Sequence, residues 1–476
     1  MVINTPQFQT DKRFGGTFCC PEETVHKMWM STLARVARPA LQRSTSAVAC
    51  QAGRACRRPG HAAGPLPSRP TLTHVRGQQT LVSASPPEAR QTVRHARALE
   101  EERLVEVEWD DGGHSLYPLT WLRDNCQCPL CTLQSAQARQ LLITDLDIHS
   151  GIHSVEVIND NKVSVVWPDQ HTSVFDAEWL KKRCFSSAAR QSLQEELFLN
   201  ERHHWDSELR IPTGDFQEVL RDDEAALAWL SALRRVGIVC LKGAPTERGQ
   251  VARLAERIGY LRLTFYGHTW QVQDKHMANN LAYTSKKLSL HTDYPALHFS
   301  PGVQFVHCIS QAVEGGESEM VDGFHMAELL QREDPEAHRT LTSTLVDFTD
   351  TGRDYCDFLL QSKKYIIEVD REGRVQRINI NHATRDSVLD LPVRQVQPFY
   401  RAMRAFADIM NRPENLLDYR MEPGDMLTFD NWRLLHGRKS YVTGPDSSRH
   451  LEGAYLDWDE VMSRLRILRK SVNKRA

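Results

Sequence analysis

The chain of 476 residues lacks a strong charge excess and long apolar runs. Its formal net charge is -2 at pH 7, which gives no general attraction to nucleic acid or to an anionic membrane surface. No continuous apolar run approaches the roughly 18 residues that a membrane-spanning helix requires. The 41% of hydrophobic residues is enough for a sizeable core. We therefore expect a soluble chain of two or more domains, with neither nucleic acid nor membrane as a partner.

Acidic residues are absent from one long segment, between Thr24 and Pro87. Arg, Ser, Ala, Pro and Gly are frequent there and hydrophobic periodicity is missing, so the segment has little with which to form a core. We expect residues 1–97 to be a disordered extension. Its Arg-rich stretch MWMSTLARVARPALQRSTSAVACQ also has the composition of a mitochondrial transit peptide, although it begins well inside the chain.

The cysteines do not form the pattern of a secreted disulfide framework. Eleven cysteines are an odd number, and no secretory signal peptide accompanies them, which favours a reducing compartment. We expect a cytoplasmic protein, or a mitochondrial one if the Arg-rich stretch acts as a transit peptide. Cys184, Cys240, Cys308 and Cys356 lie singly in apolar or mixed surroundings and are expected to be buried and inert.

Short strands and turns begin near Leu104. The segments LVEVEWDDGGHSLYP and KVSVVWPDQHTSVFD alternate apolar and polar residues around turn residues, which predicts a small β-rich domain over residues 98–186. A helical connector, residues 176–185 followed by SSAARQSLQEELF, is expected to lead into a larger domain over residues 187–476.

The larger domain is predicted to be mainly β with flanking helices. Leu227, Leu230 and Leu233 have helical spacing and are followed by a buried strand at residues 237–241. Asp457 and Glu460 fit a capping pair at the start of a final helix. Many short strands with scattered helices favour a double-stranded β-helix, or jelly roll.

The most informative motif is His291-Thr292-Asp293, followed much later by His436. Two histidines and one carboxylate can hold iron on one face and leave three coordination positions open, which suits oxygen activation. His204-Trp205-Asp206 has the same His-x-Asp spacing, but it lies in a polar connecting stretch with no later partner and is expected to be surface.

The segment around His436 supports this assignment. A turn at residues 423–425 and a strand from Met426 to Phe429 precede the histidine, and Gly437 is expected to let a ligand approach the backbone. Arg449 then opens a predicted strand. Its planar guanidinium can hold a carboxylate through two hydrogen bonds, as 2-oxoglutarate would require.

A second metal site is predicted at Cys126, Cys128 and Cys131. Three thiolates within six residues can turn toward one tetrahedral ion, usually zinc, but a fourth ligand is needed. The pattern alone does not choose among the candidate histidines, which are His114, His149, His153 and His171. A closed set of four ligands would make the site structural.

The segments WLRDNCQCPLC, LTFYGHTWQVQD, HTDYPALH and DNWRLLHGRKSY closely resemble the gamma-butyrobetaine dioxygenase family, which are Fe(II)- and 2-oxoglutarate-dependent oxygenases. The resemblance runs from about Leu104 to the C-terminus. It implies a jelly-roll catalytic domain, His171 as the fourth zinc ligand, ascorbate as the reductant that maintains Fe(II), and a homodimer.

The resemblance also implies a substrate and a reaction. Aromatic faces attract quaternary ammonium groups, and the family's cage for a trimethylammonium group matches Tyr266, Trp270, Tyr283 and Tyr455. Positions that would hydrogen-bond the substrate carboxylate match Asn280, Tyr294 and Asn381. The implied reaction hydroxylates gamma-butyrobetaine at C3 to give L-carnitine, the last step of carnitine biosynthesis, and converts 2-oxoglutarate and O2 to succinate and carbon dioxide.

Two alternatives remain at this point. Trimethyllysine dioxygenase would share the iron ligands and Arg449; the transit-like stretch slightly favours it, whereas the aromatic cage argues against it. A zinc-bearing interaction protein without catalysis is the second alternative, because fold does not guarantee chemistry. The intact iron ligands argue against that reading.

Overall fold

The computed structural model describes residues 91–475, apart from residues 160, 275–279, 443 and 445–447. The acid-free segment and its transit-like stretch therefore lie outside the described residues. Within the described part of the chain, no helix has the length and apolar character needed to cross a membrane.

The small domain is built from two antiparallel three-stranded sheets. One sheet contains β1 (Val93–Leu99), β2 (Leu104–Trp109) and β3 (His114–Pro118), and the other contains β6 (Ser154–Ile158), β7 (Lys162–Val166) and β8 (Thr172–Asp176). Alternate residues of β2 and β7 point into one core, where Val107, Trp109 and Val165 are almost fully buried. Since β1 begins at Val93, the folded chain starts before residue 98, the predicted beginning of this domain.

Short elements complete the small domain and its connector. They are α1 (Leu119–Asp124), β4 (Thr132–Leu133), β5 (Ala138–Arg139), α2 (Ala177–Lys182) and α3 (Ser187–Phe198). The helix α3 lies where the helical connector is predicted, and none of its residues is buried.

The larger domain is of the jelly-roll type. Its six-stranded sheet has the order β11-β22-β13-β20-β10-β9, with bounds β11 (Trp270–Val272), β22 (His450–Leu456), β13 (Val303–Ser310), β20 (Met426–Asp430), β10 (Ile238–Lys242) and β9 (Thr213–Asp215). Its four-stranded sheet has the order β12-β21-β14-β19, with bounds β12 (Leu288–His291), β21 (Leu434–Arg438), β14 (Ser318–Asp322) and β19 (Leu417–Tyr419). Cys240 and Leu427 of the first sheet share one apolar cluster with Met320 of the second, so side chains from both sheets fill the space between them.

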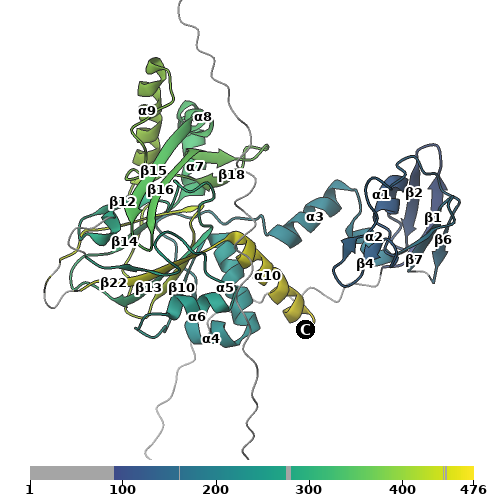
Figure 1. Ribbon diagram of the computed structural model, residues 1–476, viewed down its shortest axis with the longest axis horizontal. Helices are drawn as coiled ribbons and strands as arrows, with labels where there is room; N and C mark the ends of the chain where they lie inside the picture. The colour runs from purple at the N-terminus through teal and green to yellow at the C-terminus, as the bar shows by residue number, and fades with distance from the viewer. Residues whose placement is uncertain (1–90, 160, 275–279, 443, 445–447, 476) are drawn as a thin grey trace, which may run out of the picture. The chain divides into compact units, whose positions relative to one another are not determined.

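Helices cover this core in two groups (Figure 1). One group packs with the six-stranded sheet and consists of α4 (Phe216–Arg221), α5 (Asp223–Val236), α6 (Gln250–Glu256) and α10 (Trp458–Asn473). The other packs with strands of the four-stranded sheet and consists of α7 (Gly323–Glu333), α8 (Pro335–Ser343) and α9 (Val393–Met410). Two hairpins join the second group, β15 (Leu345–Arg353) with β16 (Asp357–Tyr365), and β17 (Ile367–Val369) with β18 (Val375–Ile378).

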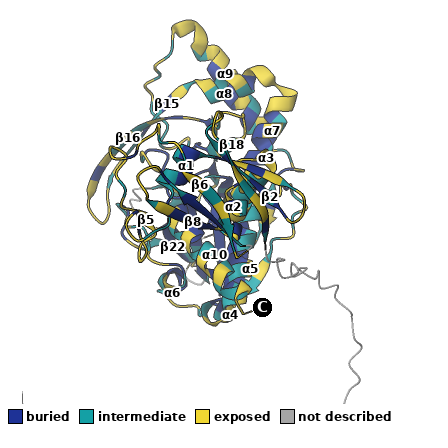
Figure 2. Cartoon of the chain, turned by 90° about the vertical axis from the view of Figure 1, so that its right-hand side faces the viewer, coloured by how far each residue is buried: buried dark blue, intermediate teal, exposed yellow. Residues whose placement is uncertain are grey.

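Most local predictions agree with these elements. Leu230 and Leu233 are buried on α5, and β10 follows that helix as expected. In Figure 2 the helices α7, α8 and α9 carry exposed as well as buried residues. Of the four single cysteines, Cys356 is the exception to the expected burial: it is exposed because it lies in the turn between β15 and β16.

The predicted capping pair of α10 is wrong. Asp457 occupies the N-cap position but makes no side-chain cap hydrogen bond. Its carboxylate instead accepts a hydrogen bond from Arg262 at 2.5 Å, and Glu460 accepts one from the hydroxyl of Tyr260 at 2.8 Å. A hydrogen bond from a charged arginine to a carboxylate is stronger than one from a neutral backbone N–H. Both carboxylates therefore bind residues from other parts of the chain instead of capping the helix.

Candidate active site and second metal site

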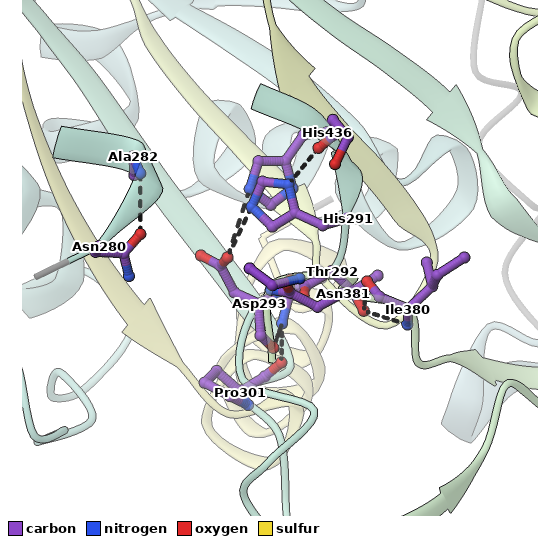
Figure 3. Close-up of polar contacts among 12 residues, drawn as sticks. Asn280, Ala282, His291, Thr292, Asp293, Pro301, Ile380, Asn381 and His436 are labelled. Carbon is purple, nitrogen blue, oxygen red and sulfur yellow. Dashed lines mark hydrogen bonds and ion pairs between the residues drawn. The ribbon is translucent and has the colours of Figure 1, made fainter. Parts of the chain in front are cut away.

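The strands β12 and β21 place His291 and His436 side by side as cross-strand partners. Their ring centroids are 4.3 Å apart. Asp293 follows β12, and its Oδ1 lies 3.2 Å from Nε2 of His291 and 3.8 Å from Nε2 of His436. In Figure 3 the three side chains point toward one another. The structure therefore brings together the three predicted iron ligands.

The other His-x-Asp sequence does not bring its own histidine and aspartate together, although His204 lies with His325 and Glu328 in a group whose possible ligand atoms are within 4.8 Å of one another. His204 is exposed, and its Nδ1 lies 3.0 Å from a carboxylate oxygen of Glu328. Asp206 accepts a hydrogen bond from the backbone N–H of Glu208 at 2.9 Å, which is a local turn contact. The structure thus places this pair on the surface, as the sequence analysis expects.

Hydrogen bonds hold the orientation of two of the three ligands, His291 and Asp293, whereas Nδ1 of His436 has no hydrogen-bond partner among the described residues. Nδ1 of His291 lies 2.8 Å from the carbonyl oxygen of Ser289, which leaves Nε2 facing Asp293. The hydroxyl of Tyr455 donates to Oδ2 of Asp293 at 2.6 Å, and the backbone N–H of Asp293 donates to the side chain of Asn431 at 2.8 Å. Supporting contacts of this kind fix the direction of metal ligands.

The protonation states of the three ligands also bear on whether they can bind a divalent cation. Burial would raise the pKa of Asp293, but the hydrogen bond from His291 and the charges of both histidines outweigh it and hold that pKa well below its usual range. Burial and the neighbouring His291 lower the pKa of His436 to about 3. Burial would lower the pKa of His291, but its hydrogen bond to Asp293 raises it, so metal binding would displace a proton from this histidine. An ionised carboxylate and neutral imidazoles are the ligand forms that a metal requires. Two imidazoles and one carboxylate with open positions fit Fe(II).

The face opens into a cavity of about 490 Å³. All predicted substrate residues line this cavity together with the iron ligands and Arg449: Tyr266, Trp270, Asn280, Tyr283, Tyr294, Asn381 and Tyr455. Residues from distant parts of the sequence therefore line the same cavity.

Five aromatic rings form a continuous arc in this cavity, in the order Tyr283, Tyr266, Tyr294, Tyr455 and Trp270. Successive ring centroids are 6.4, 5.7, 5.6 and 5.4 Å apart. Four of the rings are the predicted cage. The fifth, Tyr294, is predicted for the carboxylate end but lies in the middle of the arc. Its backbone φ of 61° is rare for a residue other than glycine and marks local strain beside the metal ligands.

A glycine makes room for one end of the arc. Gly453 on β22 is paired with Trp270 on β11. A Cβ atom at Gly453 would lie 2.1 Å from the indole ring, so the absence of a side chain lets the ring lie across the strand.

Gly437 also permits a close approach: it has no Cβ, and the carbonyl oxygen of Leu288 lies 2.7 Å from the ideal Cβ position. The close neighbour is thus the backbone of β12, where the sequence analysis expects a ligand.

The two predicted asparagines support backbone as well as lining the cavity. Asn280 accepts a hydrogen bond from the N–H of Ala282 at 2.9 Å and donates to the hydroxyl of Tyr266 at 3.1 Å. Asn381 accepts a bond from the N–H of Ala383 at 3.0 Å and donates to the carbonyl of Thr292 at 3.5 Å. Figure 3 shows both beside the iron face.

Arg449 is buried without an anionic partner among the described residues. Its side chain lies over the ring of Tyr441, with the guanidinium carbon 5.6 Å from the ring centroid, and its Nε has no hydrogen-bond partner in the described chain. Burial lowers the pKa of Arg449 to about 10, so the group remains charged at neutral pH. A buried cation of this kind requires an anion.

Two charged residues that line the cavity, Arg438 and Asp350, are not among the predicted site residues. Arg438 lies two positions after His436 on β21 and donates to the carbonyls of Ala282, Thr284 and Lys286, which ties down the segment before β12. The sequence spacing could have predicted that Arg438 lines the cavity, because residues two apart in a strand point to the same face and His436 is a predicted iron ligand. Asp350 on β15 also lines the cavity.

The small domain holds the second predicted metal site. The Sγ atoms of Cys126, Cys128 and Cys131 lie 3.3, 3.6 and 3.6 Å from Nε2 of His171. Zinc bonds of about 2.3 Å to sulfur and 2.0 Å to nitrogen, at an angle of roughly 109°, would separate these atoms by about 3.5 Å. The three sulfur–nitrogen distances therefore match those of a tetrahedral zinc site, and all four donor atoms lie within 4.8 Å of one another.

Of the four candidate histidines, His171 is the one that the structure brings to the thiols. His114 is instead 3.2 Å from Glu106 on the neighbouring strand. The cysteine loop is held by the hydroxyl of Thr132, which donates to the carbonyl of Cys126 at 2.7 Å. Arg123 donates to the sulfur of Cys131 at 3.4 Å.

Known proteins resemble the chain over most of its described length. The family model "Taurine catabolism dioxygenase TauD, TfdA family" matches residues 200–455, and "Gamma-butyrobetaine hydroxylase-like, N-terminal" matches residues 96–181. Gamma-butyrobetaine dioxygenase of Homo sapiens is 58% identical over 381 residues, which cover 80% of this chain and 98% of that protein. The enzyme of that name from Pseudomonas sp. (strain AK-1) is 34% identical, with coverage of 77% and 94%. Mitochondrial trimethyllysine dioxygenase of Mus musculus is 28% identical, with coverage of 74% and 82%.

Proposed function

Because the chain belongs to the gamma-butyrobetaine dioxygenase family, we propose that it hydroxylates gamma-butyrobetaine at C3 to give L-carnitine. The observation that carries the proposal is the arc of aromatic rings beside the face of His291, Asp293 and His436. An aromatic wall can bind a trimethylammonium group, and iron held on this face would supply the chemistry that oxidises a neighbouring methylene.

The enzyme is an Fe(II)- and 2-oxoglutarate-dependent dioxygenase. His291, Asp293 and His436 would hold the iron. Bound iron with 2-oxoglutarate and O2 supplies the oxidising chemistry, in which 2-oxoglutarate becomes succinate and carbon dioxide and a C–H bond becomes C–OH. The protein contributes the donor set, the orientation of the reactants and the exclusion of water.

Arg449 would bind the carboxylate of 2-oxoglutarate that is remote from the metal. The guanidinium is buried and has no anion beside it in the described chain, and its planar fork matches a carboxylate through two hydrogen bonds. A co-substrate held at both ends keeps a single orientation, which favours productive turnover.

The substrate would be held at both ends as well. Four rings of the arc are proposed to take the trimethylammonium group: Tyr266, Trp270, Tyr283 and Tyr455. Asn280, the hydroxyl of Tyr294 and Asn381 are proposed to hydrogen-bond the carboxylate. The buried hydroxyl of Tyr294 supports this role, because it has no hydrogen-bond partner among the described residues. A grip at two points presents one methylene to the iron and accounts for hydroxylation at a single carbon.

We also propose that Cys126, Cys128, Cys131 and His171 bind a structural Zn²⁺. The donor spacing supports this assignment. Four protein ligands leave no open position, so the ion would brace the small domain and take no part in catalysis.

Ascorbate as the reductant and a homodimeric state complete the proposal and rest on the resemblance to the family. A cytoplasmic location rests on the cysteine pattern, and the alternative is a mitochondrial location if the Arg-rich stretch acts as a transit peptide. Light scattering coupled to size exclusion tests the dimer. Progress curves with and without ascorbate test the reductant, since turnover should decline early without it. Fractionation of cells that express the full chain tests the location.

The experiment for the main proposal measures succinate release by iron-loaded protein with 2-oxoglutarate and O2. Gamma-butyrobetaine and trimethyllysine are supplied in parallel, beside a reaction without substrate. We expect gamma-butyrobetaine to stimulate succinate release, with L-carnitine formed in equal amount. Stimulation by trimethyllysine alone would keep the iron chemistry and overturn the substrate, and stimulation by neither would overturn both.

A further inference from the structure

A carboxylate stands on the wall of the active cavity where the strand pattern calls for an apolar residue. Along β15, Val346 and Phe348 are 0% and 1% exposed. Asp350 continues the same face, because side chains two apart in a strand point the same way, and it lines the cavity. The inward face of β15 thus ends in a negative charge.

This charge has no cationic partner among the described residues. Burial raises the pKa of the Asp350 carboxyl and the charge of Asp293 raises it further, whereas only the backbone N–H of Thr351 favours its ionised form. On the opposite face of the strand, Asp347 lies 3.4 Å from the ammonium group of Lys363. Asp350 is half-buried, and keeping a partly buried charge unpaired is unfavourable, which points to a partner that a ligand supplies.

The position of Asp350 along the cavity indicates the sign and place of that partner. Tyr266, a ring of the arc, packs against Phe358 with ring centroids 5.7 Å apart, and Phe358 pairs with Gly352, which lies two residues from Asp350 on the same face of β15. The charge of Asp350 also adds to the rise that burial produces in the pKa of Tyr266. The arginines of the cavity, Arg438 and Arg449, lie instead against Tyr441. The cavity therefore has an anionic wall at the arc and cationic groups elsewhere.

We propose that Asp350 determines specificity by recognising the positive charge of the substrate's quaternary ammonium group at the aromatic arc. The inference rests on the proposed function, because it concerns the same substrate. Aromatic rings hold a trimethyl group partly through apolar contact, which a neutral tert-butyl group of the same shape would also make. A carboxylate acts through charge and so separates the two ligands.

The test compares gamma-butyrobetaine with 5,5-dimethylhexanoate, in which carbon replaces the ammonium nitrogen. Dissociation constants are measured by calorimetry on full-length protein loaded with Fe(II) and 2-oxoglutarate under nitrogen. The variants are Asp350→Asn and the matched control Asp347→Asn, which changes the same residue type on the opposite face of the same strand. Asp350→Thr is a second neutral variant suited to a strand, in case the first fails to fold.

We expect Asp350→Asn to weaken gamma-butyrobetaine binding about tenfold, the size of one partly screened charge interaction at short range. The binding of 5,5-dimethylhexanoate should stay unchanged, and Asp347→Asn should match the unsubstituted protein with both ligands. Equal losses for the two ligands, or no loss for either, would overturn the inference. The same holds if Asp350→Thr keeps the preference for the charged ligand.

A parallel assay in air separates this inference from the proposed function. If the unsubstituted protein binds gamma-butyrobetaine in an Asp350-dependent way but forms no L-carnitine, the proposed function fails and recognition of the ammonium group by Asp350 stands. If L-carnitine forms and Asp350→Asn binds both ligands as before, the proposed function stands and the inference fails.

Discussion

The two candidate metal sites of this protein are built in opposite ways. In the small domain, three donors lie within one short loop, Cys126 to Cys131, and a single histidine closes the set. In the larger domain, two donors of a short motif meet His436, which pairs with His291 across two strands. The first set offers four donors, whereas the second offers three beside a cavity of about 490 Å³. Four protein donors would close a metal site, whereas three would leave coordination positions open.

The largest effect is expected when the carboxylate is removed from the three donors of the larger domain. Asp293→Ala should reduce succinate release to the background without enzyme, because two imidazoles alone do not provide the donor set for iron. Thermal unfolding should still show a folded protein. Asp206→Ala is the matched control, since it changes the other His-x-Asp sequence and should keep full activity. Undiminished turnover by Asp293→Ala would remove the iron assignment.

One donor can also be removed from the four-residue candidate zinc site of the small domain. Cys128→Ser should reduce bound zinc from about one ion per chain to almost none, because a closed zinc site depends on all four donors. The small domain should then unfold at a lower temperature. Metal analysis by mass spectrometry and scanning calorimetry measure both effects. The exposed thiol of Cys356 supplies the control, and a Cys356→Ser protein that also lost zinc would contradict the site.

A smaller effect is expected where the open side receives 2-oxoglutarate. Arg449→Gln should raise the KM for 2-oxoglutarate roughly thirtyfold, equivalent to about 2 kcal/mol for a lost charged pair. The KM for gamma-butyrobetaine should change little. Initial-rate kinetics with each reactant varied in turn give both constants. A variant that lost affinity for gamma-butyrobetaine alone would place Arg449 at the substrate.

The aromatic arc allows a further test on the open side. Trp270→Leu keeps an apolar side chain but removes the ring, so the KM for gamma-butyrobetaine should rise about tenfold, which corresponds to a cation–π contact of about 1 kcal/mol or more. Gly453→Ala should act in the same direction, because a Cβ there would lie 2.1 Å from the indole ring. The KM for 2-oxoglutarate serves as the internal control, and an equal rise in both constants would indicate a general disturbance.

The smallest expected effect concerns support of a metal ligand. Tyr455→Phe keeps the ring in the arc and removes the hydroxyl that donates to Oδ2 of Asp293 at 2.6 Å. One such hydrogen bond contributes about 1 kcal/mol, so Fe(II) should bind roughly fivefold more weakly. Titration of activity with Fe(II) measures this change. Unaltered iron affinity would show that Asp293 is held well enough by Asn431 and its histidine neighbours.

Local chemistry made much of the structure predictable. The alternation in β2 and β7 and the leucine spacing of α5 required only neighbours in the sequence, and they predicted these elements correctly. The prediction for Asp457 and Glu460 was wrong because a distant arginine and a tyrosine bind these carboxylates in the folded protein. Cys356 was misjudged for a similar reason, since its exposure depends on its position in a hairpin turn.

The sequence by itself determined the chemistry that is available to this protein: the donor types of both candidate metal sites, an arginine that could hold a carboxylate and aromatic residues that could face an ammonium group. The tertiary structure decided which of these groups meet. It selected His171 from four histidines, inserted Tyr294 into the aromatic arc and turned Asp350 toward the cavity. Donor chemistry belongs to single residues and short motifs, whereas cross-strand register and long-range packing arise only when distant segments fold together.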